Sequence, residues 1–309
     1  MELVRGLHNL RPGHRGCAAT IGSFDGLHLG HQAVLAQLAN QAANRRLPAT
    51  LVTFEPQPRE YFMPDAAPPR LTRFREKLEL LRDYGVDRVV CLRFNDYLAS
   101  LTADAFIQTV LLDGLDVKYL VVGDDFRFGS KRNGDFSLLV QAGQGNGFPV
   151  VNMHTISAGN SRVSSTRIRE SLCAGDLAGA EALLGRPYRM SGRVAHGDKR
   201  GRTIGFPTAN IFLHRTAVPV EGVFAVELTG IDEQPLPGVA NVGNRPTVDG
   251  TRSLLEVHLF DFDRDIYGRH VQVGFLQKLR AERKFTSFEK LKEQILLDAG
   301  RAREFFGKA

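Results

Sequence analysis

Two histidines stand where a strand is expected to turn into a helix. Residues 22–31 read GSFDGLHLGH, which includes His28 and His31. An apolar run typical of a buried strand precedes this segment, and apolar residues at helical spacing follow it. A helix N-terminus carries unsatisfied N–H groups and the positive end of the helix dipole, and both favour a bound phosphate. We therefore predict that the two imidazoles donate to a phosphate chain, which suits nucleotidyl transfer.

The rest of this turn supplies further candidates for binding ATP. Glycines let a backbone turn sharply or approach a ligand closely, so we expect the glycines and their neighbours to contact the nucleotide. The predicted ATP-binding residues of the turn are Gly22, Ser23, Phe24, Asp25, Gly26 and Gly30. Taken alone, the two-histidine pattern also fits an ordinary loop that caps a helix.

Two loops that follow expected strands offer walls for a pocket. Residues 123–129, GDDFRFG, join a polar segment to two phenylalanines. Phe126 is predicted to stack on a flat ring there, and Asp125 is predicted to hydrogen-bond it. A surface turn with two buried phenylalanines would produce the same pattern. Pro56 and Pro58 stiffen the loop after another strand, where they would shape the pocket.

A third segment, residues 164–169, opens a predicted helix with the sequence SSTRIR. Ser164, Ser165 and Thr166 would place hydroxyl and N–H groups on phosphate oxygens. Arg169 would stabilise negative charge as it develops. A serine that caps the helix, followed by exposed arginines, is the alternative interpretation.

In the second half of the chain, residues 205–210 read GFPTAN and combine a turn with a hydroxyl and an amide. Thr208 and Asn210 offer hard oxygen ligands of the kind that Mg²⁺ prefers, so both are predicted to bind the metal. A cationic, glycine-rich loop lies upstream and is predicted to close over nucleotide phosphates, although a solvated hairpin would look similar. The predicted nucleotide-binding residues of this region are Gly197, Lys199, Gly205, Pro207, Thr208 and Asn210.

Residues 255–259, LEVHL, alternate between apolar and polar side chains. Glu256 and His258 therefore share one face of a strand. A carboxylate within hydrogen-bond reach of an attacking hydroxyl acts as the general base in phosphoryl transfer to that hydroxyl. We predict this role for Glu256, at the mouth of a barrel. The alternative is a solvent-facing pair, which antiparallel strands commonly carry.

The first half of the chain alternates expected strands and helices. This order favours a parallel sheet covered by helices on both faces, in which ligands bind beyond the carboxyl ends of the strands. Thr72 and Thr102 each precede a periodic apolar pattern and are predicted to cap the helices that follow. Strands are predicted at residues 17–24, 49–54, 88–94, 118–123 and 149–154. Helices are predicted at residues 31–44, 73–84, 103–112, 136–144, 164–174 and 177–184.

From about residue 188 the pattern changes to short β-type runs separated by glycine, proline and asparagine. Such runs indicate an antiparallel barrel or sandwich. We therefore predict a boundary near residue 186, which gives domains 1–186 and 187–309. Strands are predicted at residues 189–195, 223–229, 238–242, 254–260 and 271–275, and a helix at 287–306.

The composition sets limits on the class of protein. A net charge of +6, with 43% hydrophobic and 24% charged residues, is ordinary for a globular protein. No apolar run approaches the ~20 residues needed to span a bilayer, and the first residues lack the apolar core of a signal peptide. The three cysteines lie far apart, which favours reduced thiols. We expect a cytoplasmic protein with no membrane contact and, given the mild basic excess, no nucleic-acid partner.

Six segments, in this order, closely resemble the bacterial bifunctional FAD synthetase family, and the resemblance covers essentially the whole chain. They are GSFDGLHLGH, VGDDFRFG, SSTRIRE, GRTIGFPTAN, NVGNRPT and LEVHLFDFDRDIYG. The resemblance implies an α/β, Rossmann-like nucleotidyltransferase domain in residues 1–186, which would be the FMN adenylyltransferase. It implies an antiparallel six-stranded β-barrel with a C-terminal helix in residues 187–309, which would be the riboflavin kinase.

The same resemblance implies two reactions. The C-terminal domain would transfer the γ-phosphate of ATP to riboflavin, giving FMN and ADP, with Glu256 as the base. The N-terminal domain would then join FMN to a second ATP, giving FAD and pyrophosphate. In that step His28 and His31 would stabilise the phosphates, and Arg169 belongs to the segment that matches the family's phosphate-binding serines.

The resemblance also implies the ligands. Asp125, Phe126, Pro56 and Pro58 would lie on the flavin side of the adenylyltransferase site, and Mg²⁺ would accompany ATP. The expected partners are the small molecules ATP, riboflavin, FMN and FAD, bound by a monomer or weak oligomer. Two alternatives stay open: only one of the two activities is live, or the chain is a nucleic-acid-binding protein on a nucleotidyltransferase-like fold.

Overall fold

The computed structural model describes the chain apart from residues 154–156, 159–160, 197–205, 216, 248–249 and 308–309. Contacts divide the described residues into two units. The first unit comprises Met1–Pro68 and Thr72–Ser164, and the second comprises Pro69–Leu71 and Ser165–Ala309. The functional boundary that we predict at residue 186 stays a prediction.

The first unit is built on a six-stranded sheet in the order β1-β4-β3-β2-β5-β6, in which every pair is parallel. The predicted parallel α/β architecture is confirmed. Its strands are β1 (Glu2–Arg5), β2 (Cys17–Ile21), β3 (Ala49–Glu55), β4 (Arg88–Arg93), β5 (Val117–Gly123) and β6 (Val150–Met153), with a small ribbon of β7 (Ser157–Ala158) and β8 (Ser161–Arg162).

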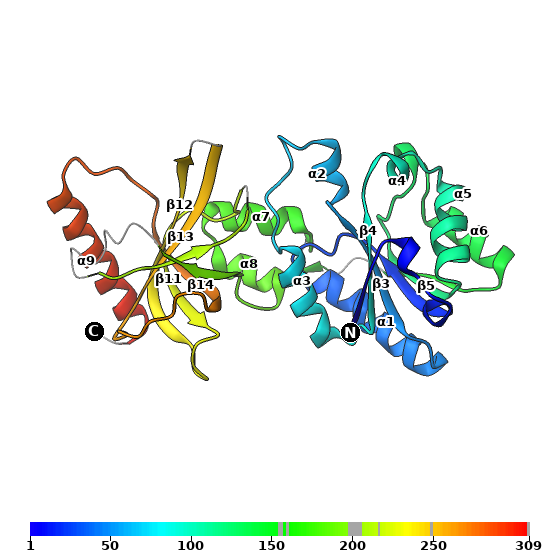
Figure 1. The fold of residues 1–309 in the computed structure, drawn as a ribbon, viewed down its shortest axis with the longest axis horizontal. Coiled ribbons are helices and arrows are strands. Elements are labelled where there is room, and N and C mark those ends of the chain that lie inside the picture. The colour runs from blue at the N-terminus through cyan, green and yellow to red at the C-terminus, as the bar shows by residue number, and fades with distance from the viewer. Residues whose placement is uncertain (154–156, 159–160, 197–205, 216, 248–249, 308–309) are drawn as a thin grey trace. The chain divides into compact units, whose positions relative to one another are not determined.

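Helices cover both faces of this sheet, because successive side chains of a strand point to opposite faces. Ala18 packs on the side of α1 (Leu29–Arg45) and α3 (Phe74–Leu81). Its neighbour Ala19 packs on the side of the helices from α4 to α6 (Figure 1). The remaining helices of the unit are α2 (Pro58–Phe62), α4 (Asp96–Ser100), α5 (Ala103–Phe106), η4 (Ile107–Gly114) and α6 (Phe136–Asn146), with short 3₁₀ turns at Leu7–Asn9, Pro12–His14, Arg82–Tyr84 and Ser130–Arg132.

The strand order reverses between β2 and β5. From β2 the chain builds outward through β3 and β4 on one side, whereas β5 and β6 lie on the other. In open α/β sheets, ligands bind in the crevice beyond the carboxyl ends of the strands at such a switch point. The turn after β2 carries the two-histidine motif, and the loop after β5 carries the motif with two aspartates. The topology therefore brings both motifs to this crevice.

The structure confirms one predicted helix cap and corrects two other local predictions. Thr102 caps α5, as predicted, since its side chain accepts the N–H of Ala105. Thr72 does not cap α3: the N-cap is Arg73, and Thr72 hydrogen-bonds elsewhere. The helix predicted at residues 103–112 is a short α-helix, α5, that widens into the π-helix η4.

The second unit contains α7 (Ser165–Ala174), α8 (Leu177–Leu184) and a closed barrel in the order β10-β13-β12-β11-β14-β9, with every pair antiparallel. The predicted six-stranded barrel is confirmed. Phe224 and Phe275 meet edge to face inside it, with ring centroids 5.3 Å apart. The strands are β9 (Arg189–Ala195), β10 (Ala209–Phe212), β11 (Gly222–Thr229), β12 (Leu236–Thr247), β13 (Gly250–Leu259) and β14 (His270–Arg280).

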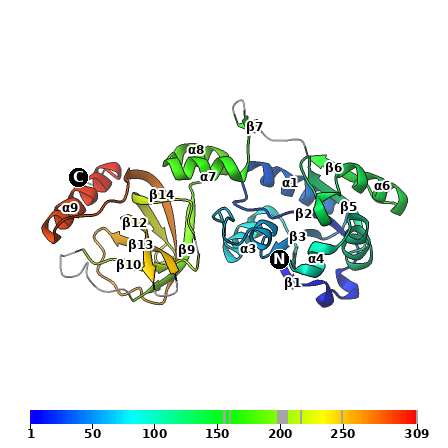
Figure 2. The same ribbon diagram turned by 90° about the horizontal axis from the view of Figure 1, so that it is seen from above.

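The C-terminal helix α9 (Phe288–Phe305) packs on the outside of the barrel (Figure 2). Ala299 and Ala302 of the helix meet Val223 and Ala225, the outward residues of β11. An ion pair at 2.8 Å between the half-buried Arg280 and the buried Asp298 ties the end of β14 to the helix. These contacts identify the outer face of the barrel, which bears on the candidate kinase residues below.

Candidate active sites

The turn after β2 has an unusual backbone. Phe24, Gly26 and Leu27 all have positive φ, at 46°, 85° and 42°. Glycine adopts this region freely, but the two side-chain-bearing residues do so only when their surroundings hold them there. The chain therefore makes a tightly constrained bend before α1 begins.

The bend ends on His28, which is the N-cap of α1. His28 Nδ1 accepts the backbone N–H of His31 at 3.3 Å, so in the neutral ring the proton sits on Nε2. The two imidazoles stack with centroids 3.7 Å apart. A Cβ on Gly30 would lie 3.2 Å from the His28 ring, which explains glycine at that position. His28 thus presents a defined Nε2–H donor at a helix N-terminus.

His28 is only 7% exposed, and burial lowers its pKa from 6.5 to about 4. The nearby carboxylate of Asp25 opposes this shift, and Arg162 reinforces it. The ring is therefore neutral at pH 7. It can stabilise a phosphate as a hydrogen-bond donor, but it does not bring a positive charge.

The loop after β5 carries the two predicted flavin residues Asp125 and Phe126. Asp125 is exposed and pairs with Arg162 at 2.8 Å, and Arg162 also reaches Asp124 at 3.4 Å. Phe126 stacks on Phe128 with centroids 5.5 Å apart. The loop is thus tied to the segment that leads to Ser164. The carbonyl of Val163, the residue before Ser164, lies 4.0 Å from where a Cβ on Gly30 would stand.

Pro56 and Pro58 lie at the carboxyl end of β3, next to β2 in the sheet. The Glu55–Pro56 peptide is cis, and Pro58 is the first residue of α2. Both prolines are half-buried. The structure therefore brings the predicted ATP and flavin residues of strands β2, β3 and β5 to the same edge of one sheet.

Ser164 is the last residue of the first unit, and the other candidates of its segment lie on α7, in the second unit. Ser165 is the first residue of that helix, and Thr166 follows it. Arg169 donates through Nε to the carbonyl of Pro69 at 2.6 Å, within the same unit. The predicted roles of these three residues stay predictions.

Glu256 lies in the middle of β13. Its neighbours Leu255 and Val257 are fully buried inside the barrel, so Glu256 points to the outer face. Strand pairing places it opposite Asn210 of β10 on one side and Asn241 of β12 on the other. The position differs from the predicted barrel mouth: the carboxylate belongs to a polar row, Asn210–Glu256–Asn241, across the outside of the wall.

His258 holds the neighbouring segment in place. Its Nδ1 donates to the carbonyl of Pro207 at 2.9 Å, and its ring lies 4.8 Å from that of Phe206. Burial lowers the pKa of His258, although the bond to Pro207 opposes that shift. Thr208, the next residue, is thereby anchored beside β13, two positions before Asn210. The predicted residues Gly197, Lys199 and Gly205 lie outside the described residues.

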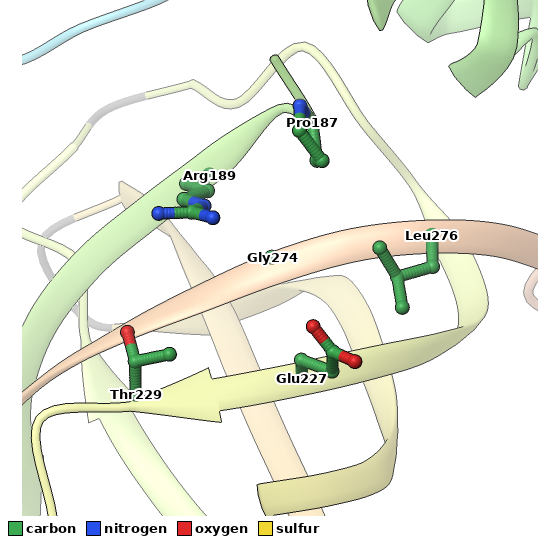
Figure 3. Close-up of a pocket in the computed structure, with 6 residues that line it drawn as sticks. All are labelled: Pro187, Arg189, Glu227, Thr229, Gly274 and Leu276. Atoms are coloured by element: carbon green, nitrogen blue, oxygen red, sulfur yellow. The ribbon is translucent and has the colours of Figure 1, made fainter. Parts of the chain in front are cut away.

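A separate hollow lies on another part of the outer barrel surface (Figure 3). Its lining residues are Pro187, Arg189, Glu227, Thr229, Gly274 and Leu276, from β9, β11 and β14 or just before them. None of them is a predicted site residue. Glu227 therefore offers an outward glutamate on the same barrel that can serve as a control for Glu256.

Three residues make contacts that the sequence did not indicate. Thr72 bonds to the histidine turn, Arg162 pairs with the aspartate loop, and His258 anchors Pro207. Each of these contacts joins residues at least 37 positions apart in the sequence. A motif search along the chain could not have found them.

The fold and the two groups of residues define a class: a nucleotidyltransferase-type α/β unit joined to a flavokinase-type barrel. Residues 10–167 match the FAD synthetase family, and residues 184–306 match the riboflavin kinase family. The chain belongs to the family of bifunctional riboflavin kinase/FMN adenylyltransferases. The described helices include none with the length and apolar character that a membrane crossing requires.

Relatives support this assignment along the whole chain. The chain is 54% identical to the bifunctional riboflavin kinase/FMN adenylyltransferase of Escherichia coli K12, over 99% of this chain and 98% of that protein. It is 51% identical to the enzyme of the same name from Haemophilus influenzae, over 99% of each. A crystal structure from Streptococcus pneumoniae, described as a macrolide-efflux protein, has a TM-score of 0.83 and 32% identity, and covers 98% of this chain and 99% of that chain.

Proposed function

We propose that this chain phosphorylates riboflavin on its barrel and adenylylates the resulting FMN at the turn after β2. The first reaction consumes ATP and yields FMN and ADP, and the second consumes ATP and yields FAD and pyrophosphate. Residues 1–186 would form the adenylyltransferase and residues 187–309 the kinase. The observation that carries the proposal is the outward carboxylate of Glu256, between two asparagines, in a chain similar to such enzymes over its full length.

For the kinase reaction, Glu256 accepts the proton of the terminal ribityl hydroxyl as that oxygen attacks the γ-phosphorus of ATP. The bond between the γ-phosphorus and the bridging oxygen breaks, and ADP leaves. Asn210 lies opposite Glu256 in the strand pair, which places an amide beside the base. General bases typically contribute about 10²–10⁴-fold to such rates.

The kinase residues fit a divalent cation. Thr208 and Asn210 supply a hydroxyl and an amide oxygen, and Mg²⁺ is commonly bound by a few protein oxygens together with substrate phosphates. The hydrogen bond from His258 to Pro207 holds this segment beside β13. When bound, Mg²⁺ would neutralise charge on the transferring phosphate.

For the adenylyl transfer, a phosphate oxygen of FMN attacks the α-phosphorus of ATP and pyrophosphate leaves. His28 donates from Nε2 to the phosphates, because its Nδ1 is occupied by the N–H of His31. The N-terminus of α1 adds its dipole. Asp125, Phe126, Pro56 and Pro58 would contact the flavin. Ser164, Ser165, Thr166 and Arg169 keep the phosphate-binding roles that the sequence predicts.

The proposal includes a cytoplasmic location and a monomeric or weakly associating chain whose partners are ATP, riboflavin, FMN and FAD rather than nucleic acid. The test is chromatography of riboflavin incubated with the purified protein, ATP and Mg²⁺. We expect FMN to appear first and FAD after it. Accumulation of FMN alone would refute the proposed adenylyltransferase activity, and unchanged riboflavin would refute the proposed kinase activity. A second incubation that starts from FMN separates the two outcomes.

A further inference from the structure

Thr72 is bound to the turn that carries the catalytic histidines. Its backbone N–H donates to Asp25 Oδ1 at 2.9 Å, and its hydroxyl donates to the same oxygen at 3.2 Å. The hydroxyl also accepts the backbone N–H of Gly26 at 3.0 Å. Three hydrogen bonds thus join two segments that are 46 or 47 residues apart in the sequence.

These bonds lie in the interior of the first unit. Asp25 is 3% exposed and Thr72 is 5% exposed. Hydrogen bonds to a buried carboxylate are stronger than those between neutral groups, and losing one costs stability because the carboxylate is shielded from water. The contact therefore fixes the relative position of its two segments more firmly than a surface hydrogen bond would.

The segment that Thr72 holds is the strained one. Phe24 and Leu27, with φ of 46° and 42°, flank Asp25 and Gly26. Side-chain-bearing residues keep such angles only where the surrounding structure imposes them. Leu27 directly precedes His28, the N-cap of α1. The backbone conformation of the turn therefore sets the orientation of the His28 ring.

The buried carboxylate of Asp25 forms its hydrogen bonds within the protein interior. A carboxylate repels phosphate oxygens, whereas here its Oδ1 receives two donors from Thr72. Its charge also raises the pKa of His28, against the larger effect of burial. The residue therefore suits a supporting role beneath the turn better than direct contact with the nucleotide.

We propose that Thr72 is a positioning residue for adenylyl transfer: together with Asp25 it holds the turn after β2 so that His28 Nε2–H and the N-terminus of α1 face the phosphates. This inference rests on the proposed adenylyltransferase function. Sequence reasoning predicts a different role for Thr72, as a helix cap, and the structure gives that position to Arg73.

The test compares three variants by the rate of FAD formation from FMN. Thr72→Val removes the hydroxyl at nearly constant volume, and we expect kcat to fall about tenfold to hundredfold, the cost typical of a small misplacement of reacting groups. Thr72→Ser keeps the hydroxyl and should stay within about threefold of the wild type. Thr53→Val is the matched control, because Thr53 is fully buried and its hydroxyl has no hydrogen-bond partner among the described residues.

Two further readings separate positioning from folding. Riboflavin phosphorylation by the barrel should be unchanged in all three variants, and calorimetric titration with FMN should give the wild-type stoichiometry. The proposal fails if Thr72→Val retains full FAD synthesis, if Thr72→Ser loses as much activity as Thr72→Val, or if the loss merely follows a lower binding stoichiometry.

Imidazole NMR keeps this test separate from the proposed function. In histidine-labelled protein, His28 should show the Nε2–H tautomer in the wild type and in Thr72→Ser, and a mixture of tautomers in Thr72→Val. Absence of FAD synthesis in the wild type would refute the adenylyltransferase alone. An unchanged His28 tautomer in Thr72→Val would refute the positioning role of Thr72.

Discussion

The turn after β2 and the outer wall of the barrel hold their candidate residues in different ways. In the turn, His28 and Asp25 are more than nine-tenths buried, and positive φ angles bend the backbone. In the barrel wall, Glu256 and its asparagine neighbours are half-buried, and ordinary strand pairing sets their spacing. The first arrangement depends on long-range polar contacts, and the second depends on the register of strands.

This difference predicts how each region responds to substitution. A barrel wall owes its register to the apolar interior, so an outward side chain can be replaced without moving its neighbours. A strained turn held by buried hydrogen bonds passes a change at one residue on to the next. We therefore expect substitutions in the barrel wall to lower activity without lowering stability. Substitutions in the turn should lower both activity and stability.

The largest expected effect is that of Glu256→Gln on riboflavin phosphorylation. Loss of the base should lower kcat about 10²–10⁴-fold, while FMN is still converted to FAD and the thermal midpoint of the barrel is unchanged. Assays of the two reactions on one preparation measure both.

Glu227→Gln provides the control, because Glu227 is also outward and half-buried but lies in the separate hollow. It should keep kinase activity. Equal losses in the two variants would show that any outward glutamate supports the barrel, and Glu256 would then have no special role.

The next effect concerns His28, where capping and chemistry can be separated. His28→Ala and His28→Asn should each lower FAD synthesis about 10²-fold by removing a donor to the phosphates. Asparagine is a good N-cap and alanine a poor one, so only His28→Ala should also cost about 1 kcal/mol of stability. Kinetics and chemical denaturation of each variant check this pair of expectations.

If His28→Asn retained most of its activity, the imidazole would be only a cap. If both variants were as stable as the wild type, the bond between His28 Nδ1 and the N–H of His31 would contribute nothing to the helix. Either result would weaken the contrast between the buried turn and the barrel wall.

The buried turn should also make stability depend on pH. The pKa of His28 is lowered to about 4 in the folded protein, whereas the unfolded chain binds the same proton near pH 6.5. Between these values the unfolded state holds more protons, so stability is intact above about pH 6.5 and falls as the pH drops toward 4. The full loss is about 3 kcal/mol. Denaturation at pH 7.5 and pH 4.5 should show a smaller difference for His28→Asn than for the wild type.

Much of this architecture follows from periodicity in the sequence. The strand at Arg189–Ala195 and the helix at Leu177–Leu184 match their predictions residue for residue, because each has a regular apolar pattern. The edge strand β1 and the barrel strand β10 were missed. Each has four residues, and β10 contains one fully buried side chain, Ile211, so its extended form depends on pairing with β9 and β13.

The candidate sites show the same difference between local sequence patterns and long-range contacts. Motifs predicted which segments carry His28 and Glu256, since a strand-to-helix turn and an alternating strand are local patterns. They did not predict that Glu256 lies on the outer wall, which requires knowing which face the barrel encloses. Nor did they predict the contact between Asp25 and Thr72, because 47 residues separate these partners.

The smallest expected effect comes from a pair of glycines, one in each region. A Cβ on Gly243 of the barrel wall would overlap the carboxylate of Glu282, which is the exposed end of a flexible side chain and can move away. Gly243→Ala should therefore change kinase activity by no more than about twofold. A Cβ on Gly30 would meet the packed ring of His28 at 3.2 Å, so Gly30→Ala should lower FAD synthesis about tenfold. Parallel assays of the two reactions compare these costs directly. Equal losses would mean that the barrel wall is as tightly packed around its substrates as the turn, and the contrast between the two regions would fail.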